Sequence, residues 1–307
     1  MPNITLNNGV EMPQIGLGTF LIPKEKLSRT IAKAYELGYR QFDSAWRYHN
    51  EKEIAQALKE NGIKREDVFI TTKVNRDALY VKPYRPGKGK ILNIRNFKSV
   101  KKVILESFEN LGTDYIDLFL VHWPYPMNLS MRMYEELTKL YHEGRIRAIG
   151  VCSSLPPIFE AYKTISDVVP AVNQFEISPL NTQKQLIKYC QDKGVVVQAM
   201  STFSHFRSNE PRKEILESQV IRPIAEKKGK SVAQVVLRWL VQQQVAIIPK
   251  TWDPVFLKEN ISIKDFSLTA EEMETIDTLD EGKFLNYDPY RWLGTIPKEY
   301  RKSWNGF

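Results

Sequence analysis

Eight short, mostly apolar runs alternate along this chain with longer segments of helical periodicity. The apolar runs are residues 15–19, 40–45, 68–74, 116–123, 146–153, 171–177, 195–201 and 246–250. Their apolar residues are continuous rather than alternating, which is typical of strands buried on both faces of a parallel sheet. Eight repeats of strand and helix predict either a closed barrel or a long doubly wound sheet, and the count of eight favours a (β/α)8 TIM barrel.

The segments between these runs are predicted helices, and several end next to a glycine, which suits the left-handed residue at a helix C-terminus. The predicted helices are residues 25–37, 51–61, 98–111, 131–143, 155–165, 182–193 and 231–243, with 253–261 after the eighth run. The chain has 307 residues, which lies within the range of one barrel of this kind. We therefore predict a single domain over residues 1–307.

Four further segments lie outside the eight repeats. Residues 3–12 predict a β-hairpin that plugs the bottom of the barrel. Residues 75–96 predict a long loop after the third strand, and loops of this length are usually functional or disordered. Residues 267–279 predict an extra C-terminal helix that begins with a capping box, and an aromatic-rich tail follows from residue 280 to 307.

The net charge of +8 first indicates a nucleic-acid partner, but its distribution argues against one. Residues 82–102 hold eight lysines and arginines and no acidic residue, so this one segment equals the whole excess. Such a run is usually a solvated loop and helix start, and the alternative is a rim that recruits acidic substrates. No run is apolar and long enough for a membrane span, and no secretory signal is recognisable. With two cysteines and no disulfide framework, we expect a cytoplasmic protein.

Ionisable side chains stand at the ends of three successive predicted strands. Asp43, Lys73 and His122 end the second, third and fourth runs, and Tyr48 follows the second run by a few residues. The carboxyl ends of barrel strands form the mouth where active sites are built, so these four side chains are expected to meet there. Each alone could be a satisfied structural group, but several buried charges on one face are costly without a shared purpose.

The four side chains together predict proton delivery to a carbonyl oxygen. An ordinary phenol has a pKa of about 10, and the ammonium of Lys73 is expected to lower the pKa of Tyr48. Asp43 holds Lys73 protonated, and His122 orients the substrate oxygen. Protonating a carbonyl requires an electron source, and a hydride cofactor fits a chain with no other redox group. The predicted reaction is NAD(P)H-dependent reduction of an aldehyde or ketone to an alcohol, with Tyr48 as the general acid.

Two other functions compete with this prediction. Lys73 on a barrel strand also suits a Schiff-base aldolase, although the partner Asp43 would keep it protonated and a poor nucleophile. A non-enzymatic nucleotide-binding regulatory protein is the other alternative. No metal site is predicted, because the four histidines lack ligand spacing, and no Gly-rich dinucleotide fingerprint occurs.

The motifs that carry these residues resemble those of the aldo-keto reductase family. The resemblance lies in residues 42–51, 118–124, 144–151, 173–176, 248–251 and 259–260. It implies a catalytic tetrad of Asp43, Tyr48, Lys73 and His122, an NADPH laid across the barrel mouth, with NADH as the alternative, and usually a monomer. The implied cofactor contacts are Thr19, Phe20, Asp43, Cys152, Ser153, Gln174, Met200, Ser201, Phe203, Lys250, Thr251, Glu259 and Asn260. The implied substrate contacts are Trp123, Phe20 and Tyr80.

Within the resemblance, Gln174 would bond to the nicotinamide amide and Lys250 with Thr251 would meet the 2′-phosphate. Glu259 and Asn260 would contact the adenine. The sequence departs from the family around this cofactor seat. Cys152 and Ser153 stand where the family usually has Ser-Asn, Met200 replaces a stacking tyrosine, and Phe256 replaces an arginine that binds phosphate.

Overall fold

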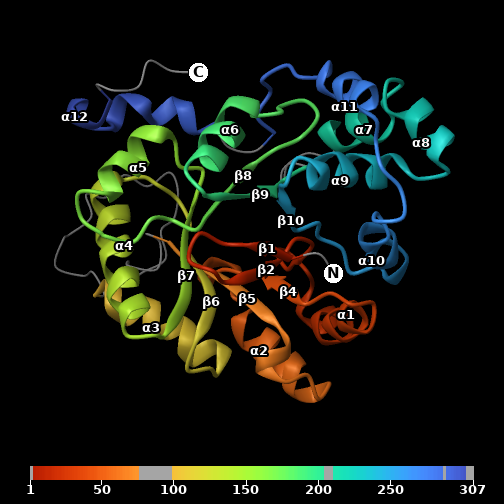
Figure 1. Cartoon of the computed structure of the whole chain (residues 1–307). Helices are drawn as coiled ribbons and strands as arrows, with labels where there is room; N and C mark the ends of the chain where they lie inside the picture. The colour runs from red at the N-terminus through yellow and green to blue at the C-terminus, as the bar shows by residue number, and fades with distance from the viewer. Residues whose placement is uncertain (1–2, 76–98, 204–209, 286–287, 302–307) are drawn as a thin grey trace, which may run out of the picture.

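The computed structural model describes residues 3–75, 99–203, 210–285 and 288–301, and the statements below concern those residues. Parallel strands form one sheet in which neighbours along the chain are neighbours in space (Figure 1). The strands are β3 (Leu17–Gly18), β4 (Gln41–Asp43), β5 (Phe69–Val74), β6 (Ile116–Val121), β7 (Ile146–Cys152), β8 (Val172–Glu176), β9 (Val196–Met200) and β10 (Ala246–Ile247).

The two outer strands of this sheet meet and close it. Ile15, just before β3, forms a parallel bridge with Ile247 of β10. The amide of Gly16 donates to the carbonyl of Ile247 at 2.8 Å, and the amide of Ile247 donates to the carbonyl of Gln14 at 2.8 Å. The predicted (β/α)8 barrel is confirmed, and the alternative of an open doubly wound sheet is wrong.

Helices surround the barrel (Figure 1). They are α1 (Lys24–Glu36), α2 (Glu51–Glu60), α3 (Val100–Leu111), α4 (Met127–His142), α5 (Pro156–Tyr162), α6 (Lys184–Asp192), α7 (Glu210–Leu216), α8 (Arg222–Lys228), α9 (Val232–Gln242), α10 (Pro254–Ile261), α11 (Ala270–Asp277) and α12 (Lys298–Arg301). Short 3-10 turns are η1 (Trp46–Tyr48), η2 (Arg65–Asp67) and η5 (Pro289–Thr295). Within the described ranges, no helix is long and apolar enough to cross a bilayer.

Each predicted helix is present, and the differences lie at helix ends and in three helices that were not predicted, α7, α8 and α12. Helix α4 begins at Met127, directly after its N-cap Pro126, rather than at residue 131. Helices α7 and α8 lie between β9 and α9, where the alternation of strands and helices predicted only one helix, at residues 231–243. The capping box predicted for the extra C-terminal helix is present at Thr269 and Glu272 of α11.

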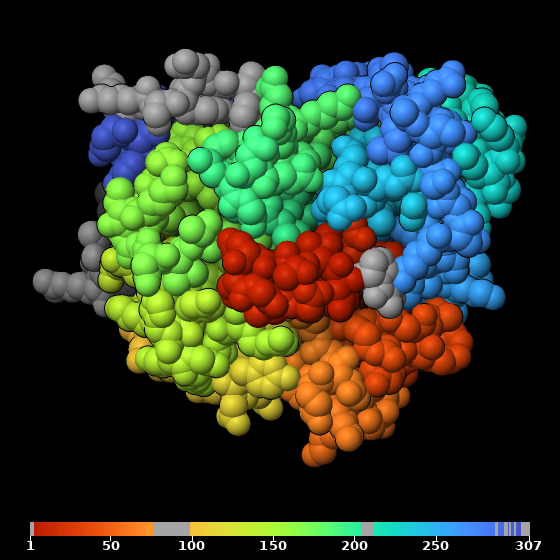
Figure 2. All heavy atoms as spheres, in the orientation of Figure 1, coloured from red at the N-terminus to blue at the C-terminus, as the bar shows by residue number. Residues whose placement is uncertain are grey.

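The N-terminal hairpin covers one end of the barrel, as predicted. Strands β1 (Asn3–Thr5) and β2 (Glu11–Pro13) pair antiparallel and lie across the centre of the face shown in Figure 2. Leu6 and Met12 are buried in a cluster with inward side chains of the barrel strands. The amide of Asn8 donates to the carbonyl of Arg147 at the start of β7, so the covered end is the one where strands begin.

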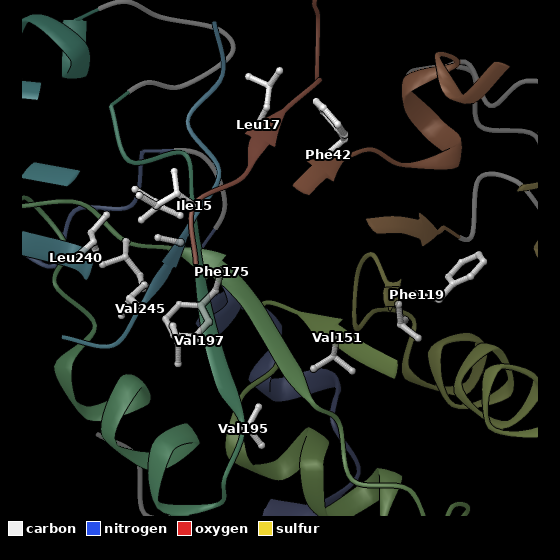
Figure 3. Close-up of a cluster of buried hydrophobic side chains, with 14 of the residues drawn as sticks. Ile15, Leu17, Phe42, Phe119, Val151, Phe175, Val195, Val197, Leu240 and Val245 are labelled. Atoms are coloured by element: carbon white, nitrogen blue, oxygen red, sulfur yellow. The ribbon is translucent and has the colours of Figure 1, made fainter. Parts of the chain in front are cut away.

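Alternate residues of each strand point to opposite sides of the barrel wall. Phe42, Phe119 and Val151 pack in the apolar layer between strands and helices (Figure 3). Their neighbours along the strands therefore face the interior of the barrel, which is how Asp43 and Cys152 come to point inward. The same alternation turns Lys73 inward and Thr72 outward, where the Thr72 hydroxyl donates to Glu51 of α2 at 2.6 Å.

Candidate active site

Three of the predicted residues meet around the ring of Tyr48, which ends turn η1 directly after β4. The ammonium nitrogen of Lys73 lies 5.1 Å from the centre of the Tyr48 ring. The ring of His122 lies 5.8 Å from it, edge to face at 78°. Phe20, a predicted substrate and cofactor contact, packs on the same ring at 4.7 Å. Tyr48, Lys73 and His122 of the predicted tetrad are therefore assembled at the mouth of the barrel.

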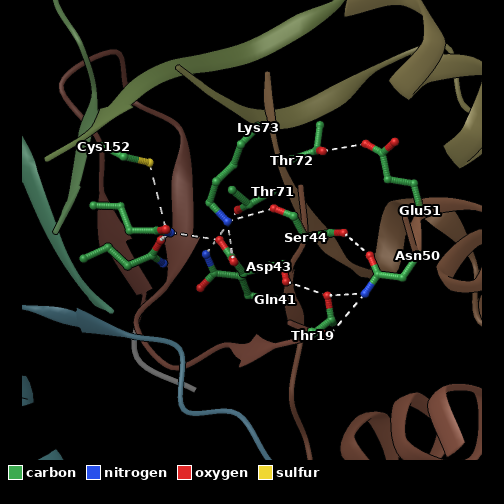
Figure 4. Close-up of polar contacts among 12 residues, drawn as sticks. Thr19, Gln41, Asp43, Ser44, Asn50, Glu51, Thr71, Thr72, Lys73 and Cys152 are labelled. Carbon is green, nitrogen blue, oxygen red and sulfur yellow. Dashed lines mark hydrogen bonds and ion pairs between the residues drawn. The ribbon is translucent and has the colours of Figure 1, made fainter. Parts of the chain in front are cut away.

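Lys73 and Asp43 form a fully buried ion pair inside the barrel (Figure 4). The ammonium lies 2.5 Å from Oδ1 of Asp43 and donates to the backbone carbonyl of Ser44 at 2.8 Å. Burial alone would lower the pKa of Lys73, but the charge of Asp43 outweighs it and leaves the pKa above its usual value. Lys73 is therefore a stable cation and a poor nucleophile, which argues against the aldolase.

A hydrogen-bonded network fixes the turn that carries Tyr48 (Figure 4). The amide of Asn50 donates to the carbonyl and the hydroxyl oxygen of Thr19, both at 3.1 Å. Asn50 accepts from the hydroxyl of Ser44 at 2.6 Å, and Thr19 donates to the backbone carbonyl of Asp43 at 2.8 Å. The predicted cofactor contact Thr19 thus also ties β3 to the turn, and all four residues of the network are buried.

The pKa of Tyr48 differs from the expectation. Burial raises it to about 12, and the nearby charge of Lys73 only partly offsets that rise. The expectation that Lys73 would bring the pKa below its ordinary value is wrong for the protein alone, because sequence shows the neighbouring charge but not the desolvation. Tyr48 retains some exposure and keeps its proton at neutral pH, which is the state that a general acid requires.

His122 is buried and uncharged. Burial lowers its pKa well below the usual value, and the positive charges of Lys73 and Arg47 lower it further. Its ring stacks on that of Trp123 at 5.4 Å and 9°, which fixes its plane. A neutral imidazole in a fixed orientation can donate one hydrogen bond to an oxygen beside Tyr48.

Several predicted cofactor contacts lie at the carboxyl ends of β7, β8 and β9. Ser153 and Ser201, which follow β7 and β9, both adopt left-handed backbone with φ of 46° and 55°. Such strain in residues other than glycine is concentrated at functional sites. Met200 and Phe203 are half-buried nearby in sequence, while Gln174 is buried inside the barrel. Burial raises the pKa of Cys152 to about 12, so its thiol stays protonated.

The predicted phosphate and adenine contacts lie apart from the tetrad, after β10 and on α10. Burial and then the charge of Arg212 lower the pKa of Lys250. Cations that repel one another in this way are suited to an anionic ligand. Lys250 also lies 5.0 Å from the ring of Trp252. Phe256 is 45% exposed near the start of α10, so an apolar ring lies at the surface where the family resemblance implied an arginine.

The remaining predicted contacts on this side make local bonds. The hydroxyl of Thr251 accepts from the amide of Asp253 at 3.1 Å. Glu259 accepts a hydrogen bond from Ser231, and Asn260 is buried. A dinucleotide laid from β7 to α10 fits these residues. They are the strained Ser153 and Ser201, the inward amide of Gln174, and the neighbouring cations Lys250 and Arg212. Tyr80 and most of the basic segment 82–102 lie outside the described residues.

Comparison with known proteins identifies the family. Residues 14–281 match the model of the Aldo/keto reductase family. The chain is 38% identical to morphine 6-dehydrogenase of Pseudomonas putida, over 94% of each chain. It is 35% identical to glyoxal reductase of Bacillus subtilis, over 93% of this chain and 95% of that one.

Solved structures of aldo/keto reductases also match this chain. An aldo/keto reductase from Brucella melitensis superposes with a TM-score of 0.78 at 34% identity, over 91% of this chain and 99% of that one. A variant of Gox0644 in complex with NADPH superposes with a TM-score of 0.80 at 29% identity, over 94% and 97%. The chain therefore belongs to the aldo/keto reductase family. It is an NAD(P)H-dependent oxidoreductase, and its cofactor is NADP(H).

Proposed function

We propose that this protein reduces a small aldehyde or ketone to an alcohol, with Tyr48 as the general acid. The observation that carries the proposal is the buried Lys73–Asp43 pair placed under the Tyr48 ring, with a neutral His122 at its edge. A phenol that is protonated at neutral pH and lies next to a fixed cation can give up a proton and have the resulting phenolate stabilised.

Each tetrad residue then has a distinct part. Tyr48 donates its proton to the substrate oxygen, and Lys73 stabilises the phenolate that remains. Asp43 keeps Lys73 charged and in place, and His122 donates a hydrogen bond that orients the carbonyl. Bound NADPH supplies the hydride for the carbonyl carbon.

The residues expected to hold the cofactor divide into two groups. Gln174, Ser153 and Ser201 would hold the nicotinamide end, with Met200 covering the ring as a thioether rather than an aromatic face. Lys250 and Thr251 would bind the 2′-phosphate, which favours NADPH over NADH. Phe256 offers no charge there, so we expect a smaller preference for NADPH than a bidentate arginine would give.

The substrate class follows from the two aromatic side chains that border Tyr48 and His122. Phe20 packs on Tyr48, and Trp123 stacks on His122, so the carbonyl would enter between apolar faces. Relatives include reductases of glyoxal and of methylglyoxal, which are small carbonyl compounds. We propose compounds of this size as substrates. The two free cysteines are buried, which fits a reducing cytoplasm. We also propose that the protein is a monomer, which light scattering would check.

The experiment is nucleotide titration followed by turnover. Wild-type protein is titrated with NADPH and NADH by fluorescence, and NADPH oxidation is then followed with a panel of small aldehydes and ketones. Tyr48→Phe should bind NADPH normally and lose at least about a hundredfold in kcat, the lower range for general acid catalysis. Tyr115→Phe, a tyrosine whose hydroxyl bonds to the carbonyl of Arg65 outside the site, is the matched control. Full turnover by Tyr48→Phe would refute the assignment.

A further inference from the structure

Three side chains at one level of the barrel interior form a row across neighbouring strands. Cys152 of β7 is in register with Gln174 of β8, and Gln174 is in register with Gln198 of β9. All three are buried, at 1%, 2% and 0% exposure. Cys152 and Gln174 are predicted cofactor contacts, whereas Gln198 is not among the residues predicted from the sequence. Its polar side chain within an apolar strand is the signal that could have found it.

The amide nitrogen of Gln174 uses both of its hydrogens inside the barrel. It donates to Oδ2 of Asp43 at 2.9 Å and to Oε1 of Gln198 at 2.7 Å. Its own oxygen lies on the side of Cys152, whose sulfur is 4.0 Å away. The Gln174 amide is thus held at two points and keeps its oxygen free of strong donors within the described part of the chain.

The two acceptors hold the Gln174 amide in different ways. The Asp43 carboxylate pairs with Lys73 and can only accept hydrogen bonds, so it requires the nitrogen of Gln174. If the Gln174 amide were turned over, its oxygen would face the carboxylate oxygen of Asp43, which cannot donate a hydrogen bond. The Gln198 bond adds a second point of attachment, which holds the Gln174 amide in the orientation that Asp43 selects.

Gln198 makes this bond in an otherwise unfavourable setting. Its Nε2 has no hydrogen-bond partner among the described residues, although it is buried. Burying an unpaired amide group is destabilising, and an apolar side chain would fill a strand of this kind without that penalty. Among the described residues, the hydrogen bond that the Gln198 side chain makes is the one to Gln174.

We propose that Gln198 is a positioning residue that orients the Gln174 amide for the nicotinamide end of the cofactor. This inference rests on the proposed function, in which Gln174 holds that end. With two fixed points, Gln174 presents its oxygen as an acceptor without having to be ordered when the cofactor binds. Removing one point leaves the Gln174 amide free to sample other orientations, and binding must then order it.

The test uses the full-length protein and the variant Gln198→Met, which keeps the length of the side chain and removes the acceptor. NADPH binding is measured by fluorescence titration, and binding of 2′,5′-ADP, which lacks the nicotinamide half, is measured by calorimetry. We expect NADPH to bind about fivefold to tenfold more weakly, as for the loss of one net hydrogen bond. The affinity for 2′,5′-ADP should not change, because that half of the site lies away from Gln174.

Three further variants separate positioning from general damage. Gln198→Glu is expected to stay neutral when buried and to keep an oxygen that accepts from Gln174, so NADPH affinity should return. Gln14 lies just before the first barrel strand, and its buried side-chain amide donates to the carbonyls of Val241 and Val245. Gln14→Met removes these bonds and should lower stability while leaving NADPH affinity unchanged. In a Gln174→Met background, adding Gln198→Met should have no further effect on NADPH affinity.

The outcomes distinguish the inference from the proposal beneath it. Wild-type affinity for NADPH in Gln198→Met, or an equal loss for NADPH and 2′,5′-ADP, overturns the positioning role alone. A wild-type protein that fails to bind NADPH overturns the proposed function, and this inference with it.

Discussion

The single substitution Lys73→Met is expected to lower the free energy of unfolding by several kcal/mol. Lys73 is fully buried, and its ammonium makes the 2.5 Å contact to Asp43 and the 2.8 Å bond to the carbonyl of Ser44. The variant leaves the Asp43 carboxylate buried without its counter-charge. Breaking a buried pair in this way costs about 3–5 kcal/mol. Asp43 keeps the 2.9 Å bond from Gln174, so we expect a loss near the lower limit, about 3 kcal/mol.

That loss is a large share of the stability of an ordinary domain, about 5–15 kcal/mol in total. The matched control is Lys188→Met, which removes an i,i+4 pair with Asp192 in which both side chains are more than half exposed. Such surface pairs contribute about 0.3–0.5 kcal/mol. The double variant Lys73→Met with Asp43→Asn should recover much of the loss, because no charge is then left unpaired in the barrel.

Urea unfolding followed by tryptophan fluorescence at neutral pH gives the free energies of unfolding for the four proteins. The reasoning fails if Lys73→Met loses no more stability than Lys188→Met. It also fails if the double variant is as unstable as Lys73→Met, because the loss would then come from the missing lysine stem and not from an uncompensated carboxylate.

Three shorter predictions follow from the same structure. Burial raises the pKa of Tyr48 to about 12, so carbonyl reduction should not lose activity through Tyr48 between about pH 6 and 9. Alcohol oxidation needs the phenolate, so its rate should rise with pH. An oxidation rate that falls over this range contradicts the assignment. Gly150→Ala would bring a Cβ within 2.6 Å of the carbonyl oxygen of Val172 and should cost at least about 2 kcal/mol in urea unfolding. Thr269→Ala removes the cap of α11 and should cost about 1 kcal/mol, measured in the same way.

The sequence predicted the barrel well because its signal is local. Strands buried on both faces are continuous apolar runs, and each of the eight predicted runs contains a strand of the barrel. The ends were less certain: β10 has only two residues where five were expected. At that strand the chain turns toward Lys250, and Pro249 has no amide to continue the ladder. Helices α7 and α8 were not predicted because the alternation of strands and helices leads one to expect a single helix between β9 and β10.

The tetrad was predictable and its electrostatics were not. Asp43 and Lys73 lie at the carboxyl ends of β4 and β5, and His122 directly follows β6, so their meeting at one mouth follows from parallel topology alone. The pKa of Tyr48 depends on how much water reaches the phenol, which is a property of the packed barrel mouth. The role of Gln198 depends on register and on the direction of an amide, and neither can be read from composition or spacing.

The hydrogen bond from Gln174 to Asp43 shows why these features belong together. The sheet runs in order from β3 to β10 and closes on itself, so β4 and β8 stand on opposite sides of the barrel. Gln174 on β8 nevertheless reaches Asp43 on β4 through the interior. The proton-donating side, built on β4, β5 and β6, is thereby joined to the side that would hold the nicotinamide, built on β7, β8 and β9. A change at Gln198 should consequently affect Tyr48 only through Gln174 and Asp43. In a double-mutant cycle on NADPH affinity, Gln198→Met and Asp43→Asn should be coupled, whereas Gln14→Met and Asp43→Asn should be additive.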